Sequence, residues 1–231
     1  MTAMLDLQCF QKEEYLNRGS FCEVSRCIKR SDGQAYAMKT VVKTNKPQDQ
    51  AIAMEVHCLK ELSSSPWIPK LIFEVDTGPE WIGVMDLCER GELWEYVKDC
   101  GCCLADESTF YIAQMVEAVF SVHTCGIVHR DLKCENFLIA ADRSLKLIDF
   151  GTARDERHNA VKPMLLGPQY EHHVGTPNFM SPEAVHGKAN DRRSDLWSLG
   201  CTIYQMVTGT PPFASATPFL TLQKAQAGKL S

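Results

Sequence analysis

Two stretches in the middle of the chain carry acidic and amide side chains at short, fixed spacings. In HRDLKCEN, Asp131 and Asn136 lie five positions apart, with Lys133 between them, in a non-periodic turn flanked by predicted strands. Eighteen residues after Asp131, the alternating segment SLKLIDFG brings Asp149 to a predicted strand end. Magnesium ions prefer such oxygen ligands, and they usually keep waters and bridge substrate phosphates. We therefore expect these side chains to converge around a magnesium ion.

A lysine and a glutamate earlier in the chain are candidates for an ion pair. Ala35, Ala37 and Lys39 alternate onto one face of a predicted strand, where two small residues leave room for a flat ligand. Glu55 lies on the apolar face of the next predicted helix, where an unpaired carboxylate is costly to desolvate. An ion pair between Lys39 and Glu55 would satisfy both groups. Taken alone, these two residues favour a solvent-facing lysine and a helix-edge glutamate, and only the other motifs change that balance.

The elements that position Lys39 and Glu55 form a predicted β-rich part at the start of the chain. Residues 8–42 read as three antiparallel strands, and further strands follow at PKLIFEV and WIGVMDL. Between them a helix begins at Pro47. Its predicted apolar face comprises Ala51, Glu55, Cys58, Leu59 and Leu62. This part, five strands and one helix, ends at a predicted hinge near DLCERG.

The rest of the chain is predicted to be mainly helical. The segment DLWSLGCTIYQMVTG is apolar nearly all round, so we expect a central helix that is buried on every side. The stretch RDERHNAVKPMLLGPQYEHH lacks periodicity and reads as a mobile surface loop. A second core helix stops at Gly126. Its predicted buried stripe comprises Ile112, Met115, Val116, Val119, Phe120 and His123.

Composition narrows the classes of partner. The 231-residue chain is 45% hydrophobic and 23% charged, with a formal net charge of −5. That charge gives no electrostatic reason to expect nucleic acid or an anionic membrane. No stretch approaches the roughly 18 apolar residues of a membrane span, and no secretory signal is evident, so we expect a cytoplasmic protein.

The eleven cysteines are interpreted as reduced thiols that pack as small hydrophobic residues. The run CGCC, with Cys100, Cys102 and Cys103, is the best metal candidate among them. It lacks a second pair at zinc-like spacing, so zinc is not expected.

The ordered set of loop, lysine, glutamate, HRDLKxxN and DFG resembles the eukaryotic protein kinase family, from about Leu16 to at least Leu222. Lys133 and the stretch GTPNFMSPE resemble the serine/threonine type. GEL, IDFGTAR and SDLWSLGCTIYQMVTGTPPF are similar to the phosphoinositide-dependent protein kinases of the AGC group. The resemblance implies a bilobal α+β fold, with an N-lobe at residues 1–86 and a helical C-lobe at 87–231 that is incomplete at its C-terminus.

The resemblance also implies catalytic roles. Lys39 would hold the α and β phosphates of ATP, with Glu55 positioning it. Asp131 would accept the proton of a Ser or Thr hydroxyl on a protein substrate, and Lys133 would neutralise the transferring phosphoryl group. The two residues implied to bind Mg²⁺ are Asn136 and Asp149.

Apolar side chains would hold the base of the nucleotide. Val24, Ala37 and Leu138 would sandwich the adenine, although plain core packing explains the same residues. Met85 would be the gatekeeper and Glu92 would reach the ribose. The full set implied to bind the nucleotide is Leu16, Gly19, Val24, Ala37, Lys39, Glu55, Met85, Asp86, Cys88, Glu92, Leu138 and Asp149.

Other residues are implied to support this site. Thr176 would line the substrate site, and Asp195 would anchor the backbone of the loop that carries Asp131. A hydrophobic stack joining the two lobes would comprise Leu59, Leu71, His129 and Phe150.

The stretch LNRGSFCEV matches the phosphate-binding loop of the family but keeps only Gly19 of three expected glycines. Asn17 tolerates a left-handed backbone better than most residues, whereas the Cys22 side chain would crowd the phosphates. We expect a working nucleotide site with weakened ATP affinity. The alternative is a pseudokinase or truncated kinase fragment that acts as a binding or scaffold module. The residues matching Lys39, Asp131 and Asp149 are all present, which favours an enzyme.

Two further expectations concern regulation and the C-terminus. Arg130 is implied to pair with an activation-loop phosphate, but His172 stands at the acceptor position, so Glu171 or another nearby carboxylate is expected instead. Glu183 is expected to be buried and to lack an arginine partner that would lie beyond the end of this sequence. A truncated, unstable domain would follow, with exposed apolar surface near Ile203, Tyr204 and the C-terminus.

Overall fold

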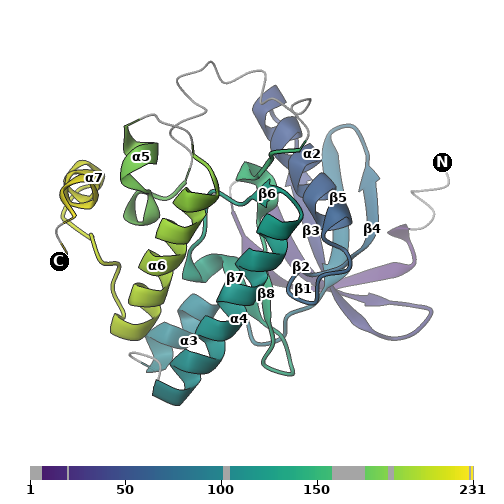
Figure 1. The fold of residues 1–231 in the computed structure, drawn as a ribbon. Helices are drawn as coiled ribbons and strands as arrows, with labels where there is room; N and C mark the ends of the chain where they lie inside the picture. The colour runs from purple at the N-terminus through teal and green to yellow at the C-terminus, as the bar shows by residue number, and fades with distance from the viewer. Residues whose placement is uncertain are drawn as a thin grey trace.

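The computed structural model describes residues 7–19, 21–100, 105–157, 175–186, 190–228 and 230. The chain forms two parts, an antiparallel sheet with one helix and a larger, mainly helical part (Figure 1). The sheet lies at one end of the molecule and the last helix, α7 (Pro218–Ala227), lies at the other (Figure 1). The α+β, bilobal prediction is confirmed.

The sheet contains five antiparallel strands in the order β1-β2-β3-β5-β4. Cys27, Met38 and Val84 are buried in its hydrophobic core. Lys39 pairs with Val24 on one side and Gly83 on the other, so it sits in the middle of the sheet. The strands are β1 (Phe10–Arg18), β2 (Cys22–Lys29), β3 (Ala35–Val42), β4 (Leu71–Asp76) and β5 (Glu80–Asp86).

Helix α2 (Lys46–Glu61) lies against this sheet. The Asn45 side chain accepts a hydrogen bond from the backbone N–H of Gln48, and Pro47 occupies the first turn, where its missing N–H does no harm. The predicted face of the helix is confirmed. Glu55, Cys58, Leu59 and Leu62 are buried, and Ala51 is half-buried.

In the larger part, α4 (Ala105–Thr124) and α6 (Arg192–Thr208) pack together. Two small antiparallel sheets pack against α4. They pair β6 (Ile127–Val128) with β9 (Arg154–Asp155), and β7 (Phe137–Ile139) with β8 (Leu145–Leu147). The remaining elements are α3 (Leu93–Cys100), α5 (Pro182–Val185), α7 (Pro218–Ala227), and the 3-10 turns η1 (Cys134–Asn136), η2 (Phe150–Thr152) and η3 (Pro177–Phe179).

One hydrophobic core joins the two parts. Leu59 of α2 and Phe150 of η2 are buried in the same cluster, and Leu71 packs against it. The His129 ring meets the Phe150 ring edge to face, with centroids 4.9 Å apart. The predicted stack between the lobes is therefore confirmed.

The structure corrects the predicted stripe of α4. Val116 and Phe120 are 46% and 66% exposed, so they do not belong to the buried face. The pattern was ambiguous because α4 is apolar on more than one side, and only the packing of α6, β6 and β8 selects the face that is buried. The apolar residues that the structure shows buried on α4 are Tyr111, Met115, Ala118, Val119 and Val122.

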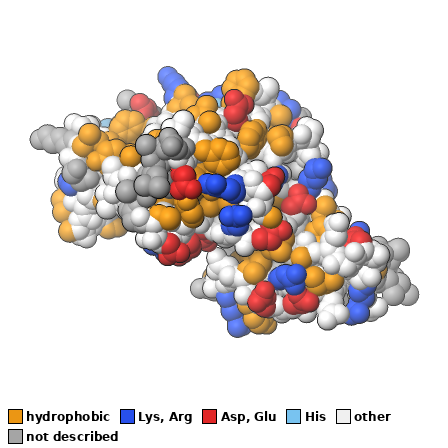
Figure 2. Space-filling model, turned by 90° about the horizontal axis from the view of Figure 1, so that it is seen from below, with side chains coloured by type: hydrophobic (Ala, Val, Ile, Leu, Met, Phe, Trp, Pro, Cys, Tyr) orange, Lys and Arg blue, Asp and Glu red, His pale blue; other side chains and the backbone are white. Residues whose placement is uncertain are grey.

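Helix α6 is also less enclosed than predicted. Leu196 and Val207 are exposed, and Ile203 and Tyr204 are half-buried. Exposed apolar side chains do occur towards the C-terminus, at Phe219 and elsewhere on α7. Figure 2 shows hydrophobic side chains gathered on the underside of the helical part, whereas charges of both signs are interspersed over the sheet end.

Three further expectations need correction or fall outside the description. Glu183 is exposed, so it is not a buried carboxylate without a partner. Arg154 and Asp155 form strand β9 rather than the start of a loop. The remainder of that predicted loop from residue 158, including Glu171 and His172, lies outside the described residues.

The nine cysteines that the structure describes are all free. Cys102 and Cys103 of the CGCC run lie outside the described residues. Within the described ranges no cluster of three His, Cys, Asp or Glu side chains could hold a metal ion. No helix in those ranges is both long and apolar enough to cross a membrane.

Candidate active site

One wall of the site, which we call the upper wall, is formed by β3 and α2 and carries the predicted ion pair. Lys39 Nζ on β3 donates to Glu55 Oε1 at 2.5 Å and to Oε2 at 2.7 Å on α2. Burial by itself lowers the pKa of the Lys39 ammonium, but the carboxylates of Glu55 and Asp149 outweigh burial and raise that pKa above its usual value. Lys39 is therefore a fixed positive charge at neutral pH.

The loop between β6 and β7 forms the lower wall, and Asp195 of α6 holds its backbone. Asp195 is fully buried and accepts hydrogen bonds from the backbone N–H groups of His129 and Arg130, both at 2.8 Å. His123 Nε2 of α4 lies 2.8 Å from the same carboxylate. Arg130 adopts a left-handed backbone with φ of 70°, which non-glycine residues adopt only when their surroundings enforce it. The predicted anchoring role of Asp195 is confirmed.

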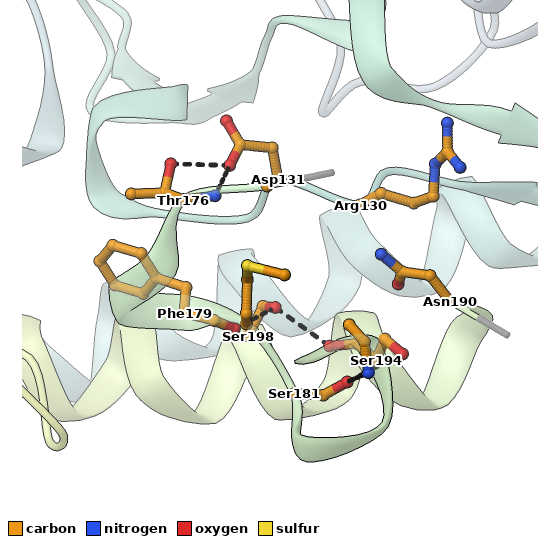
Figure 3. A pocket seen from close by; sticks show the side chains of 11 residues that line it. Arg130, Asp131, Thr176, Phe179, Ser181, Asn190, Ser194 and Ser198 are labelled. Atoms are coloured by element: carbon orange, nitrogen blue, oxygen red, sulfur yellow. Dashed lines mark hydrogen bonds between the residues drawn. The ribbon is translucent and has the colours of Figure 1, made fainter. Parts of the chain in front are cut away.

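Asp131 sits at the centre of a local hydrogen-bond network. Its Oδ1 accepts hydrogen bonds from the backbone N–H and the hydroxyl of Thr176, at 2.9 and 2.8 Å, and Thr176 lies directly beside it in Figure 3. Its Oδ2 accepts from Lys133 Nζ at 2.8 Å. Burial raises the pKa of Asp131, but Lys133 and Thr176 outweigh burial and hold that pKa below its usual value.

Asn136 is oriented by the same loop. Its side-chain Nδ2 donates to the backbone oxygen of Asp131 at 2.8 Å, so its amide oxygen is not needed within the loop. Asn136 is 5% exposed and lines the large cleft between the two parts. An amide oxygen held in this way fits a magnesium ligand.

Asp149 follows β8 and precedes the buried Phe150. Its backbone is left-handed, with φ of 66°, and the following Gly151 lies against α2. A Cβ added at Gly151 would lie 3.5 Å from the Ala51 Cβ and 3.6 Å from Asp149 Oδ1. These are ordinary van der Waals distances, and Asp149 lines the same cleft as Asn136.

The two walls enclose a cleft of about 820 Å³. Gly19 and Asp131 are the predicted site residues that do not line it. The backbone N–H of Gly19 donates to the Cys22 oxygen at 2.7 Å, in a turn between β1 and β2. Asp131 instead borders a small adjoining cavity of about 10 Å³ with Thr176 and the buried Asn190 (Figure 3). The predicted residues that line the cleft are Leu16, Val24, Ala37, Lys39, Glu55, Met85, Asp86, Cys88, Glu92, Lys133, Asn136, Leu138 and Asp149.

Sequence reasoning missed several residues that line the cleft. Gln48, Ala51 and Ile52 of α2 extend the wall that carries Glu55. Gln48 and Ala51 lie seven and four positions before Glu55, a helical spacing that could have identified them. Glu135 also lines the cleft, from the loop beside Asn136.

Two cysteines line opposite ends of this cleft. Burial raises the pKa of the Cys22 thiol, although the nearby Lys39 charge opposes the rise. Burial raises the pKa of Cys88 to about 12. Both groups are therefore neutral thiols at neutral pH, so Cys22 adds side-chain volume but no charge to the part of the cleft near Lys39.

Comparison with known proteins gives a consistent result. Residues 10–227 match the protein kinase domain family. The chain is 32% identical to Serine/threonine-protein kinase PKH1 of Saccharomyces cerevisiae over 95% of this chain and 30% of the yeast protein. It is 32% identical to 3-phosphoinositide-dependent protein kinase 1 of Arabidopsis thaliana over 89% of this chain and 43% of the plant protein.

The human 3-phosphoinositide-dependent protein kinase 1 is also 32% identical, over 93% of this chain and 38% of the human protein. The chain thus spans less than half the length of these relatives. The names of the plant and human relatives agree with the predicted similarity to phosphoinositide-dependent protein kinases. The chain belongs to the protein kinase domain family.

Proposed function

We propose that this chain transfers the γ-phosphoryl group of Mg-ATP to the hydroxyl of a Ser or Thr residue in a protein. One observation carries this proposal: Lys39, Asn136 and Asp149 face one cleft of about 820 Å³, from walls that belong to different parts of the chain. Positive charge for phosphates and oxygen ligands for magnesium are thereby brought together. Phosphoryl transfer depends on such positioning and charge stabilisation.

Lys39 binds the α and β phosphates in this proposal, and Glu55 orients it through two hydrogen bonds. Asn136 and Asp149 hold magnesium, whose chemistry is to neutralise charge on the phosphates. Lys133 lines the cleft, and its ammonium group contacts Asp131 and Thr176. Its positive charge therefore lies where it neutralises charge on the transferring group.

Asp131 receives the substrate hydroxyl. Its lowered pKa keeps the carboxylate ionised at neutral pH, so it can accept a hydrogen bond from a Ser or Thr hydroxyl. The Thr176 hydroxyl already donates to Asp131 Oδ1, which supports the idea that this carboxylate orients a donor of that kind. A carboxylate with a lowered pKa is a weak base, so its main task is to orient the hydroxyl until proton transfer becomes favourable.

The opposite end of the cleft holds the adenosine. Val24, Ala37 and Leu138 sandwich the adenine, Met85 limits the depth of the pocket, and the backbone from Asp86 to Cys88 binds the adenine edge. Glu92 reaches the ribose. Leu16 lies in β1, and Gly19 lies in the turn between β1 and β2. All but Gly19 line the cleft, which supports this assignment.

The proposal extends to organisation and location. We place the N-lobe at residues 1–86 and the C-lobe at 87–231, because β5 ends at Asp86 and the chain then enters the helical part. The nine free cysteines support a location in the reducing cytoplasm. The names of the relatives support a place in the AGC group.

The test is magnesium-dependent transfer of labelled phosphate from ATP to a generic basic protein, with Asp131→Asn as the blank. We expect labelled Ser and Thr with the wild-type chain and none above background with the variant. ATP binding with no transfer in the wild type would contradict the proposal and favour a scaffold. Labelled Tyr would contradict the assigned acceptor.

A further inference from the structure

An ion-pair cluster centred on one buried carboxylate lies away from the nucleotide cleft, between β9 and α2. The Asp155 side chain is fully buried, and its Oδ2 lies 2.9 Å from His57 Nε2 on α2. The guanidinium of Arg157 donates to both oxygens of the same carboxylate, at 3.1 Å from Nε and 2.9 Å from Nη2. We call His57, Glu61, Asp155 and Arg157 the Asp155 cluster.

Arg157 connects the cluster to a second residue of α2, Glu61. Its Nη2 donates to Glu61 Oε2 at 2.7 Å. The aliphatic part of Arg157 fills the space above Gly126, where an added Cβ would lie 2.6 Å from Arg157 Cγ. Gly126 also has φ of 75°, so both its conformation and its missing side chain admit the arginine.

The cluster fixes α2 at two adjacent turns. His57 and Glu61 are four residues apart, so they lie on one face of the helix. Glu55, which binds Lys39, is two residues before His57. A buried Asp155 carboxylate cannot lose its partners without a large desolvation penalty, so α2 and β9 are expected to move together.

The other side of this segment is tied to the helical part. Glu156 accepts a hydrogen bond from Arg192 Nε of α6 at 2.8 Å. Strand β9 itself pairs with β6, immediately before the loop that carries Asp131. Residues 154–157 therefore offer α2 a support that is tied to β6 and α6 of the helical part.

We propose that Asp155 and Arg157 are positioning residues that hold α2 where Glu55 reaches Lys39. The inference rests on the proposed kinase function, because only there does the Lys39–Glu55 pair have a catalytic task. In this arrangement side chains link residues 155–157 to α2. The residues that form this link do not line the nucleotide cleft.

The experiment compares Arg157→Met with Arg143→Met. Each arginine donates Nη2 to a glutamate, at 2.7 Å for Arg157 and 2.8 Å for Arg143, and their side chains are 42% and 44% exposed. Methionine keeps much of the aliphatic packing while it removes the charge. A second matched pair is Glu61→Gln and Glu107→Gln, which changes the charge of two arginine-paired glutamates with little change in side-chain size, and so guards against misfolding.

Two readouts are measured, namely the kinetics of phosphoryl transfer and the alkylation of Cys58. Cys58 lies on α2, is fully buried, and has a pKa raised by burial to about 12, so it should react only when α2 moves. Peptide mass spectrometry distinguishes it from Cys134, a buried thiol of the lower loop that reports general unfolding.

We expect Arg157→Met to lower kcat about tenfold, with less change in KM for ATP, and to speed Cys58 alkylation while Cys134 stays protected. Glu61→Gln should act in the same direction, and both control variants should behave as wild type. Unchanged kcat or unchanged Cys58 alkylation in Arg157→Met and Glu61→Gln would overturn the proposal. If the wild-type chain transfers no phosphate, the proposed function fails, and Cys58 alkylation alone decides whether the cluster holds α2.

Discussion

The two walls of the cleft are built in different ways. On the lower wall, Lys133 of the same loop and the distant Thr176 both bind Asp131, while the buried Asp195 of α6 fixes the loop backbone. On the upper wall, Lys39 and Glu55 belong to a strand and a helix, and they meet only if α2 keeps its place. A network of several hydrogen bonds resists displacement, whereas a single pair between two elements depends on their relative position. The lower wall should therefore be the constant half of the site and the upper wall the adjustable half.

Removing charge from either wall gives the largest expected effect on activity. Lys39→Met and Asp149→Asn should each lower kcat/KM about a thousandfold, or roughly 4 kcal/mol of transition-state stabilisation. Only Lys39→Met should also speed Cys58 alkylation, because it leaves Glu55 on α2 without its partner. Steady-state kinetics and alkylation measured on the same preparations test this contrast. Near-normal turnover in either variant would contradict the assigned phosphate and magnesium sites.

The second prediction concerns the support of the lower wall. Asp195→Ala leaves the buried N–H groups of His129 and Arg130 without acceptors, each costing about 1–3 kcal/mol in the free energy of unfolding. Asp195→Asn keeps one acceptor and should lose less. Urea denaturation followed by circular dichroism gives both values. Equal stability of wild type and Asp195→Ala would show that the loop does not depend on this anchor.

The third prediction concerns how the stability of the folded chain changes at acidic pH. The pKa of Asp131 is lower in the folded chain than its usual value, so this carboxylate stabilises the fold above its unfolded pKa of about 3.9. That stabilisation is lost as the pH falls through the folded pKa. Wild type should therefore lose more stability than Asp131→Asn when urea midpoints are compared at pH 6 and pH 3. Parallel losses in the two proteins would contradict the shift.

The smallest effect is expected at the loop above the phosphates. Cys22→Gly removes a neutral side chain that lines the cleft, so it should lower the KM for ATP a fewfold and leave kcat nearly unchanged. Cys88→Ser, at the adenine end of the same cleft, is the control for loss of a thiol. A fall in kcat with unchanged KM would indicate that Cys22 contributes to the chemical step.

Much of the site was predictable because short motifs hold several of its residues. Asp131, Lys133 and Asn136 lie in a single loop, so their spacing alone brings them together. The Lys39–Glu55 pair was predictable for a different reason, since a carboxylate on an apolar helix face needs a partner. The wall formed by Gln48 and Ile52 was not predicted. An amide or aliphatic side chain on a helix does not need one specific partner, whereas the carboxylate of Glu55 does.

The sequence alone specified the five strands and one helix of the first part, the helices α4 and α6 of the second, and the charged groups that face the cleft. Tertiary packing decided that Phe120 and Leu196 remain exposed, that Glu183 faces solvent, and that Asp155 lies buried beneath α2. The type of an apolar or charged residue does not specify which other residues surround it. Whether it is buried, and with which partner, depends on elements distant in the chain, which no local pattern specifies.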